Sequence, residues 1–391
     1  MILTVISSII LLLWMLFILQ IVRGMRLIPR LSGVEPLPDG EIPSLTVIVP
    51  ARDEERGIRA CLESLLAQEH PRLEIIAVDD RSADATGQIM DEIARGSGRR
   101  LQVIHVTDLP EGWLGKCHAL HLGAQRATGD LILFTDGDIQ FAPSTLRLAV
   151  SRLDRERGDM LVVVPELLSD SYLERAVLFG FAMTFLALCP PWRVVNPRSR
   201  TAAGAGAFNL VRRSAYERAG GHEALRMALV DDLALAQLMK WSGGRLDMVS
   251  GIGQVRVRWQ ASMGGVVRGL EKNAFGSLGF SVPRAILSIV SLLLFCGWPW
   301  AGLLVGPWPS RAMCAAISLG LFPLLGLSLR RSTGARDFPS LAFPLGGLVM
   351  AWTIARSMVV TLRRGGVRWR GTFHPLRELR DFQRRTGLGR G

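Results

Sequence analysis

Residues 45–55 read LTVIVPARDEE, a short apolar run rich in β-branched residues that stops at a polar turn. An apolar helical pattern follows through Ile58, Cys61, Leu62, Leu65 and Leu66. Three more strand-like runs alternate with helical patterns: LEIIAVDD at 73–80, LQVIHV at 101–106 and DLILFTDGD at 130–138. Strands that alternate with helices predict an α/β domain with a mostly parallel sheet covered on both faces.

Long uncharged runs lie on both sides of this region. Hydrophobic residues make up 49% of the 391 residues, which is more than an ordinary soluble enzyme contains. Residues 2–22 carry no charge and are long enough to cross a bilayer as a helix. Because the first basic residue, Arg23, comes after this run, we expect an uncleaved anchor and not a signal peptide. Further apolar runs occupy 285–310, 312–329 and 338–362.

The excess of basic residues is concentrated next to these apolar runs. The net charge is +12, and nine arginines lie between residues 363 and 391. Nucleic-acid binding is one interpretation, but arginines at membrane flanks are typical of the positive-inside pattern, so we expect no nucleic acid partner. The sequence then divides into an anchor (1–24), a soluble domain (25–280), membrane segments (281–362) and an arginine-rich tail (363–391).

The charge pattern predicts a multi-pass protein of the cell membrane, with the soluble domain and the tail in the cytosol. Three full crossings after the domain would put the tail outside. The weakest run, 338–362, contains Arg356, two prolines and Gly346-Gly347, so we expect it to be re-entrant or to lie at the interface. The five cysteines form no C-x-x-C pair, which suits a reducing compartment.

Asp136-Gly137-Asp138 carries the sharpest chemical signal. In parallel sheets ligands bind outside the carboxyl ends of the strands, and this motif directly follows the apolar run LILFT. A D-x-D alone is often a solvated turn. At this position, however, its two carboxylates are suited to hold Mg²⁺ or Mn²⁺, which would neutralise the charge of a diphosphate leaving group.

Other polar residues at the predicted strand ends have both a structural and a functional interpretation. Asp79 and Asp80 can accept hydrogen bonds from a nucleoside, or Asp80 can cap the next helix. Lys116 opens a helix where phosphate oxygens can bind, although a surface lysine is the commoner explanation. Asp231 or Asp232 can cap a helix, or can act as general base towards an acceptor hydroxyl.

Four ordered motifs resemble those of family 2 glycosyltransferases of the GT-A fold: PARDEE at 50–55, VDDRSAD at 78–84, TDGD at 135–138 and VDD at 230–232. The resemblance covers roughly 44–280. Within the family, GWLGKCHALHLGA at 112–124, residues 193–221 and the flanking spans are similar to membrane-bound hopanoid-associated and carotenoid glucosyltransferases.

The resemblance implies an inverting transfer of a hexose from a UDP- or GDP-sugar, with a divalent metal, to a lipid-like acceptor such as a terpenoid, hopanoid, carotenoid or polyprenyl compound. Asp136 and Asp138 would meet the metal, and Asp232 would be the catalytic base, with Asp231 as the second candidate. Trp259 would contact the acceptor. The donor would be held by Pro50, Arg52, Glu54, Asp79, Asp80, Lys116, Asp136 and Arg258.

The sequence departs from relatives of this family in two places. Processive polysaccharide synthases carry Q-x-x-R-W, but here position 255 is Val and Gln254 is displaced by one residue. Polymer synthesis is therefore disfavoured, and the match of Arg258 and Trp259 stays open. Asp231 stands where many members have Glu, which keeps the charge. A nucleotidyltransferase, the other enzyme class with paired carboxylates and a metal, would show a Gly-rich signature that PARDEE lacks.

The segment AVLFGFAMTFLALCPPW at 176–192 has two interpretations. It is about four helical turns long, carries no charge and lies within the soluble domain. It can be a buried core helix, or it can lie in the membrane interface and line a lipid entrance.

Overall fold

The computed structural model describes residues 1–169, 171–258, 263–333, 341–369 and 372–388. Its centre is a seven-stranded sheet in the order β3-β2-β1-β4-β8-β6-β9. The four strands expected from the sequence lie side by side and are all parallel. β8 is antiparallel to both of its neighbours. The strands are β1 (Leu45–Ala51), β2 (Leu73–Asp80), β3 (Leu101–Val106), β4 (Leu131–Phe134), β6 (Met160–Val164), β8 (Asn209–Arg212) and β9 (Leu246–Ser250).

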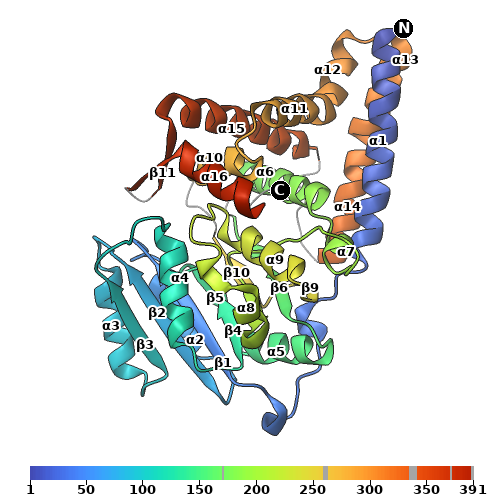
Figure 1. Cartoon of the computed structure of the whole chain (residues 1–391). Helices are drawn as coiled ribbons and strands as arrows, with labels where there is room; N and C mark the ends of the chain where they lie inside the picture. The colour runs from blue at the N-terminus through green and yellow to red at the C-terminus, as the bar shows by residue number, and fades with distance from the viewer. Residues whose placement is uncertain (170, 259–262, 334–340, 370–371, 389–391) are drawn as a thin grey trace.

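Helices cover both faces of this sheet (Figure 1). Successive residues of β1 point to opposite faces. Val47 and Val49 therefore belong to one buried cluster and Ile48 to another. The Val47 side is covered by α2 (Ile58–Leu66), α3 (Thr86–Gly96) and α5 (Thr145–Arg155), and the Ile48 side by α4 (Gly115–Arg126), α8 (Arg213–Ala219) and α9 (Asp231–Trp241). The expectation of an α/β fold with a mainly parallel sheet is confirmed.

Two small sheets complete the strand pairing. β5 (Ile139–Phe141), β10 (Val255–Val257) and β7 (Glu166–Leu167) pair in the order β5-β10-β7. β11 (Gly366–Trp369) and β12 (Thr372–Pro375) form a hairpin, which α16 (Leu376–Thr386) follows. Much of the expected arginine-rich tail is thus ordered, and Gln383 of α16 donates from Nε2 to the carbonyl of Gly276, 3.0 Å away.

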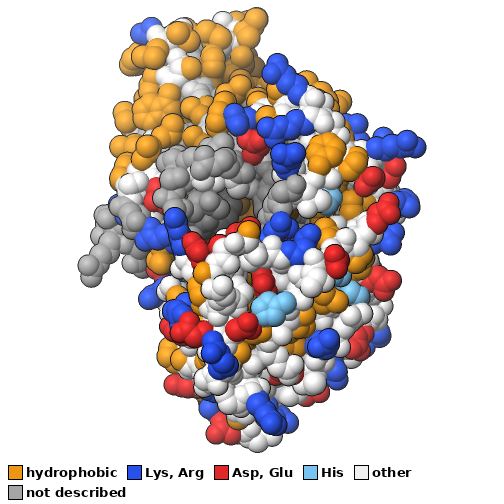
Figure 2. Space-filling view, turned by 90° about the vertical axis from the view of Figure 1, so that its left-hand side faces the viewer, with side chains coloured by type: hydrophobic (Ala, Val, Ile, Leu, Met, Phe, Trp, Pro, Cys, Tyr) orange, Lys and Arg blue, Asp and Glu red, His pale blue; other side chains and the backbone are white. Residues whose placement is uncertain are grey.

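Among the residues that the structure describes, five helices are long and apolar enough to cross a membrane: Ile2–Met25, Tyr172–Val194, Val282–Val305, Trp308–Ser328 and Pro344–Arg364. The first is α1, which stands beside α13 (Trp308–Ala315) and α14 (Phe322–Thr333) (Figure 1). Figure 2 shows hydrophobic side chains gathered at this end of the molecule and charged ones over the α/β domain. These features are those of a membrane protein.

The contacts of α1 with the carboxyl-terminal helices combine aromatic stacking with hydrogen bonds. The ring of Trp14 stacks on Phe295 at 4.1 Å, and its Nε1 donates to the carbonyl oxygen of Phe295 at 2.9 Å. The hydroxyls of Ser7 and Ser310 lie 2.6 Å apart. Small polar groups that pair between helices are a common way to join helices in a bilayer. The remaining carboxyl-terminal elements are α11 (Val282–Leu292), the π-helical η4 (Leu293–Gly297), α12 (Trp298–Val305) and the π-helical η5 (Ala316–Leu321).

α6 (Tyr172–Leu188) packs on α15 (Phe343–Arg364), and both lie across the direction of α1 (Figure 1). Gly180 and Gly346 meet at the crossing, where a Cβ on either would overlap the backbone of the other helix. Glycine at both positions lets the two helices approach this closely. The apolar segment 176–192 is therefore packed against a candidate membrane helix, below which α10 (Met263–Ser277) and α16 lie.

Candidate active site

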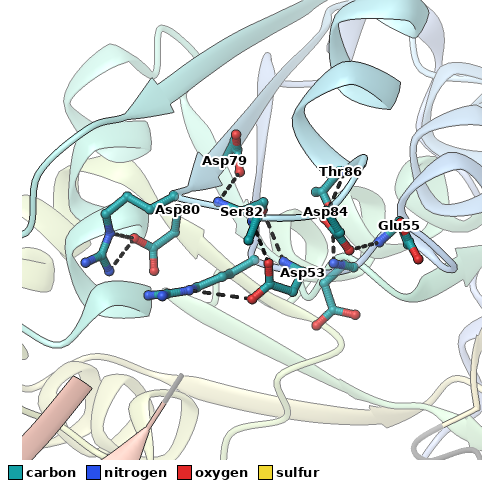
Figure 3. A network of polar contacts seen from close by, with 11 residues as sticks. Asp53, Glu55, Asp79, Asp80, Ser82, Asp84 and Thr86 are labelled. Carbon is teal, nitrogen blue, oxygen red and sulfur yellow. Dashed lines mark hydrogen bonds and ion pairs between the residues drawn. The ribbon is translucent and has the colours of Figure 1, made fainter. Parts of the chain in front are cut away.

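The loops that follow β1 and β2 are joined by a network of hydrogen bonds (Figure 3). Asp53, at φ 56°, accepts from the amide of Ala83 at 2.8 Å and donates its own amide to the Ser82 hydroxyl at 3.1 Å. The amide of Glu55 donates to Asp84 at 3.2 Å. The network fixes the polar turn 51–57 against the start of α3, and so builds a rigid rim at the carboxyl edge of the sheet.

Asp84 holds this rim together and offers a test of it. Its carboxylate accepts from the amide of Thr86 at 2.9 Å and from the amide of Glu55. We expect Asp84→Ala to lose about 1 to 2 kcal/mol of stability, because hydrogen bonds to a charged group are lost. The thermal unfolding midpoint of the detergent-solubilised protein should fall by a few degrees. Asp108→Ala, in an exposed loop, is the matched control, and equal midpoints for the two variants would contradict the role of Asp84.

Asp79 and Asp80 end β2 and point in different directions (Figure 3). Asp79 accepts from the Ser82 amide and lies 3.1 Å from Nδ1 of His105. The hydrogen bond of His105 to Asp79 raises the pKa of His105, and a second hydrogen bond of its ring, to Asp91, raises it further. The carboxylate of Asp79 is thus already used within the protein.

The carboxylate of Asp80 is only half used. Its Oδ1 accepts from Nε of Arg81 at 2.9 Å, whereas Oδ2 is buried and has no hydrogen-bond partner among the described residues. Oδ2 faces Gly115, where a Cβ would overlap it. A buried carboxylate oxygen without a partner costs stability unless a ligand supplies the donor. Of the two aspartates, Asp80 is the one with an unused acceptor oxygen.

Lys116 brings two of the motifs together. Its ammonium lies 2.7 Å from Asp136, which follows β4, and 2.9 Å from Asp231, the first residue of α9. Burial by itself would lower the pKa of Lys116, but Asp136 and Asp231 outweigh it and raise the pKa. The lysine therefore stays charged, and it joins the D-x-D turn to the carboxylates at the start of α9.

Asp138 is half-buried beside the start of α2, where a Cβ added to Gly57 would lie 3.1 Å from the Cβ of Asp138. Burial raises the pKa of Asp138 to about 7, and the nearby carboxylate of Asp136 adds to this. A carboxylate whose charge is disfavoured beside a second carboxylate forms a site that a divalent cation would stabilise. No group of three or more His, Cys, Asp or Glu residues converges anywhere in the described ranges. The residues present therefore fit a cation that takes its other ligands from substrate phosphates and water, as Mg²⁺ commonly does.

Asp231 and Asp232 are the first two residues of α9, and Val230 takes the N-cap position. Asp232 is half-buried, and its partial removal from water raises its pKa, which the neighbouring Asp231 raises further. One oxygen of Asp232 accepts from the amide of Leu233 at 2.8 Å. A carboxylate with a raised pKa is better matched to proton transfer near neutral pH than an ordinary aspartate.

One small pocket is lined by Lys116, Asp136, Asp231 and Asp232, but not by Asp80 or Asp138. It is also lined by His222, which the motifs did not indicate. The pocket is lined by Lys116, Leu120, Phe134, Thr135, Asp136, Gly206, Asn209, His222, Asp231, Asp232 and Leu235. The sequence signal for His222 was the pair Gly220-Gly221 before it, which marks a tight turn after α8. A motif search centred on carboxylates passes over such a turn.

Four other predicted residues do not line this pocket, although Glu54 lies close enough to Asp138 to help raise its pKa. Pro50 is buried in β1, and Nε of Arg52 lies 3.8 Å from Asp53 at the rim. Glu54 donates its amide to the Thr86 hydroxyl at 2.8 Å. Arg258 is exposed just after β10. Trp259, predicted to contact the acceptor, lies outside the described residues.

Residues 46–218 match the family model of glycosyl transferase family 2. This stretch contains β2, β4, the D-x-D turn and nearly all of β1, whereas His222 and the carboxylates of α9 lie beyond it. The chain carries a family 2 glycosyltransferase domain. The resemblance inferred from the four motifs is thereby confirmed, and the protein is an enzyme of the glycosyltransferase class.

Two relatives of this glycosyltransferase are similar to it over about two thirds of the chain. It is 24% identical over 264 residues to 4,4'-diaponeurosporenoate glycosyltransferase of Staphylococcus haemolyticus. The aligned region covers 66% of this chain and 68% of the relative. It is 27% identical over 253 residues to the enzyme of the same name from Staphylococcus aureus strain USA300, which covers 63% and 65%. The chain thus spans about two thirds of the length of these relatives.

A mannosyltransferase from Pyrobaculum calidifontis, solved in complex with GDP-Man and Mn²⁺, has a similar fold. The TM-score is 0.52 at 19% identity, and the superposition covers 92% of this glycosyltransferase and 99% of that chain. The expected GT-A fold is therefore confirmed.

Proposed function

We propose that this enzyme transfers a hexose, with inversion, from a UDP- or GDP-sugar to a lipid-like acceptor in the membrane. The observation that carries the proposal is the position of Lys116, whose ammonium lies within 3 Å of both Asp136 and Asp231. This contact brings Asp136, which is suited to a metal-bound diphosphate, next to the two carboxylates at the start of α9. One of these, Asp232, is suited to take the proton of the acceptor. A single site then holds both ends of a glycosyl transfer.

In this proposal Asp136 and Asp138 hold Mg²⁺ or Mn²⁺, which supplies positive charge to the leaving diphosphate. Lys116 adds a second positive charge beside the same phosphates. Asp80 accepts a hydrogen bond from the nucleoside through its unpaired Oδ2. Asp232 takes the proton of the acceptor, and one displacement without a covalent enzyme intermediate inverts the anomeric carbon.

The acceptor is an apolar lipid that reaches the site from the bilayer along α6. The helix packs on α15, and its C-cap residue Cys189 belongs to the same buried cluster as Ala234 of α9. Its carboxyl-terminal end thus leads from the candidate membrane region to the proposed base. The relatives are named for a carotenoid-type acceptor, which supports an apolar compound of that class for this chain.

The acceptor class can be tested with radiolabelled nucleotide sugar and two sets of acceptors, membrane lipids and soluble sugars or proteins. We expect label in the organic phase, reduced by Phe181→Asp or Phe185→Asp because a charge on α6 would hinder an apolar chain. Phe373→Asp, at an exposed position of the β11–β12 hairpin, is the matched control. Label found only in soluble acceptors would contradict the lipid proposal.

We also propose that the amino terminus lies outside and that the catalytic domain and α16 face the cytosol. α15 lies across the direction of α1, and we place it in the membrane interface. The two other carboxyl-terminal candidates, Val282–Val305 and Trp308–Ser328, then cross the membrane, and the arginines after residue 363 lie in the cytosol, as the positive-inside pattern requires. The described native cysteines are buried, so single added cysteines report topology. In intact cells an impermeant maleimide should label Ile2→Cys and spare Arg384→Cys, whereas labelling of Arg384→Cys would contradict this arrangement.

A further inference from the structure

His222 follows the Gly220-Gly221 turn after α8 and lines the active-site pocket. Gly220 and Gly221 have φ values of 98° and 55°, which side chains other than glycine rarely adopt. A Cβ on Gly221 would lie 3.0 Å from the ring of Tyr216. The turn therefore needs both glycines, and it leaves His222 1% exposed.

The hydrogen bonds of His222 fix which ring nitrogen carries the proton. The Tyr216 hydroxyl lies 2.7 Å from Nδ1 and accepts the backbone amide of His222 at 2.8 Å. Since that oxygen already accepts one proton, its own proton is satisfied by donation to Nδ1. The remaining proton of the neutral ring is then on Nε2. The ring also packs edge-on against Phe134, with 4.6 Å between the centroids.

Nε2 is the atom of His222 without a partner. No described residue makes a hydrogen bond with it, although the side chain is almost fully buried. Burial lowers the pKa of His222 to about 3, helped by the charges of His121 and Lys116, so the ring is neutral at physiological pH. The side chain therefore offers one neutral N–H donor to the pocket that it lines.

The pocket determines what kind of group this donor can meet. It has room for about one water molecule or one hydroxyl group. Asp136, Asp231 and Asp232 line it as hydrogen-bond acceptors, together with the ammonium of Lys116. A hydroxyl can accept from His222 and donate to a carboxylate at once, whereas an ionised phosphate oxygen has no proton to donate.

The geometry points to His222 as a sugar-reading residue, whose Nε2–H donates to one hydroxyl of the transferred hexose. This inference rests on the proposed function, in which the sugar lies between the diphosphate at Asp136 and the base at Asp232. The residue would then help to set which sugar is accepted, because an epimer with that hydroxyl reversed leaves the buried N–H unpaired.

The test compares sugar-bearing and bare nucleotides on the full-length protein in detergent with Mn²⁺. Dissociation constants are measured for UDP, GDP, UDP-glucose, UDP-galactose and GDP-mannose. We expect His222→Leu to weaken the preferred nucleotide sugar by about five- to tenfold, the effect of one buried hydrogen bond, and to leave the matching bare nucleotide within about twofold. His222→Gln, which still carries an N–H donor, should retain more of the affinity. His374→Gln, in the β11–β12 hairpin, is the control.

Each outcome separates this inference from the proposed function. Equal loss of affinity for the bare nucleotide and its sugar would make His222 a structural residue and overturn the inference alone. If transfer is lost while the affinity for every nucleotide sugar is unchanged, the N–H of His222 contacts the lipid acceptor and not the sugar. That result would also overturn the inference. A wild-type protein that binds none of the five compounds would overturn the proposed function itself.

Discussion

Asp138→Asn should lower the rate of metal-dependent transfer by about 10² to 10³, the effect of removing one electrostatic stabiliser from a reaction site. The substitution removes one negative charge from the pair that would hold the cation. Burial already disfavours the charge on Asp138 and raises its pKa to about 7, so the neutral amide fits the same space. The variant should therefore fold and remain as stable as the wild type.

The measurement is release of UDP or GDP in the presence of lipid acceptor, over a range of Mg²⁺ and Mn²⁺ concentrations. Asp108→Asn, in the exposed loop after β3, is the matched control for the loss of one carboxylate. The variant should also need more metal to reach half of its own maximal rate. A folded Asp138→Asn protein with near wild-type turnover would refute the metal assignment.

The second large effect concerns the proposed base. Asp232→Asn should lower transfer to an alcohol acceptor by about 10² to 10⁴, the usual contribution of general base catalysis. Affinity for the nucleotide sugar should survive, because the carboxylate acts on the acceptor. The amide can still accept from the amide of Leu233, so the start of α9 is preserved.

Transfer rates and donor affinities of Asp231→Asn and Asp232→Asn are measured together. The two residues differ in their contacts, since Asp231 pairs with Lys116 at 2.9 Å. We expect Asp231→Asn to disturb donor affinity through Lys116, and Asp232→Asn to affect transfer alone. The reverse pattern would make Asp231 the base, and a collapse of donor affinity in Asp232→Asn would move Asp232 into the nucleotide site.

The pH dependence of transfer reports the same assignment. Because burial raises the pKa of Asp232, its basic form is lost as the pH falls through that raised value. Transfer to an alcohol should decline over this range. A carboxylic acid acceptor is already ionised at neutral pH and needs no base, so Asp232→Asn should affect it much less. The activity of Asp232→Asn therefore tells whether the acceptor is an alcohol or a carboxylic acid.

The sequence by itself determined the layered fold and its placement beside a membrane. Strand and helix patterns are local, since each depends on the polarity of residues within one short segment. The alternation from LTVIVP to DLILFT therefore predicted the parallel core, β1 to β4, and the uncharged run 2–22 predicted α1. The D-x-D turn could be found in the same way, because its place at a strand end is a local property.

Only the tertiary structure decided which of these residues meet. Lys116 and Asp231 are far apart in the sequence, and their ion pair depends on how α4 and α9 pack on one face of the sheet. The antiparallel β8 between β4 and β6 was not predicted, because the four residues NLVR resemble any short apolar run. The role of Asp80, the crossing of α6 and α15 and the position of His222 likewise follow from packing. Contacts between distant segments depend on strand order and on close fit, which no local pattern encodes.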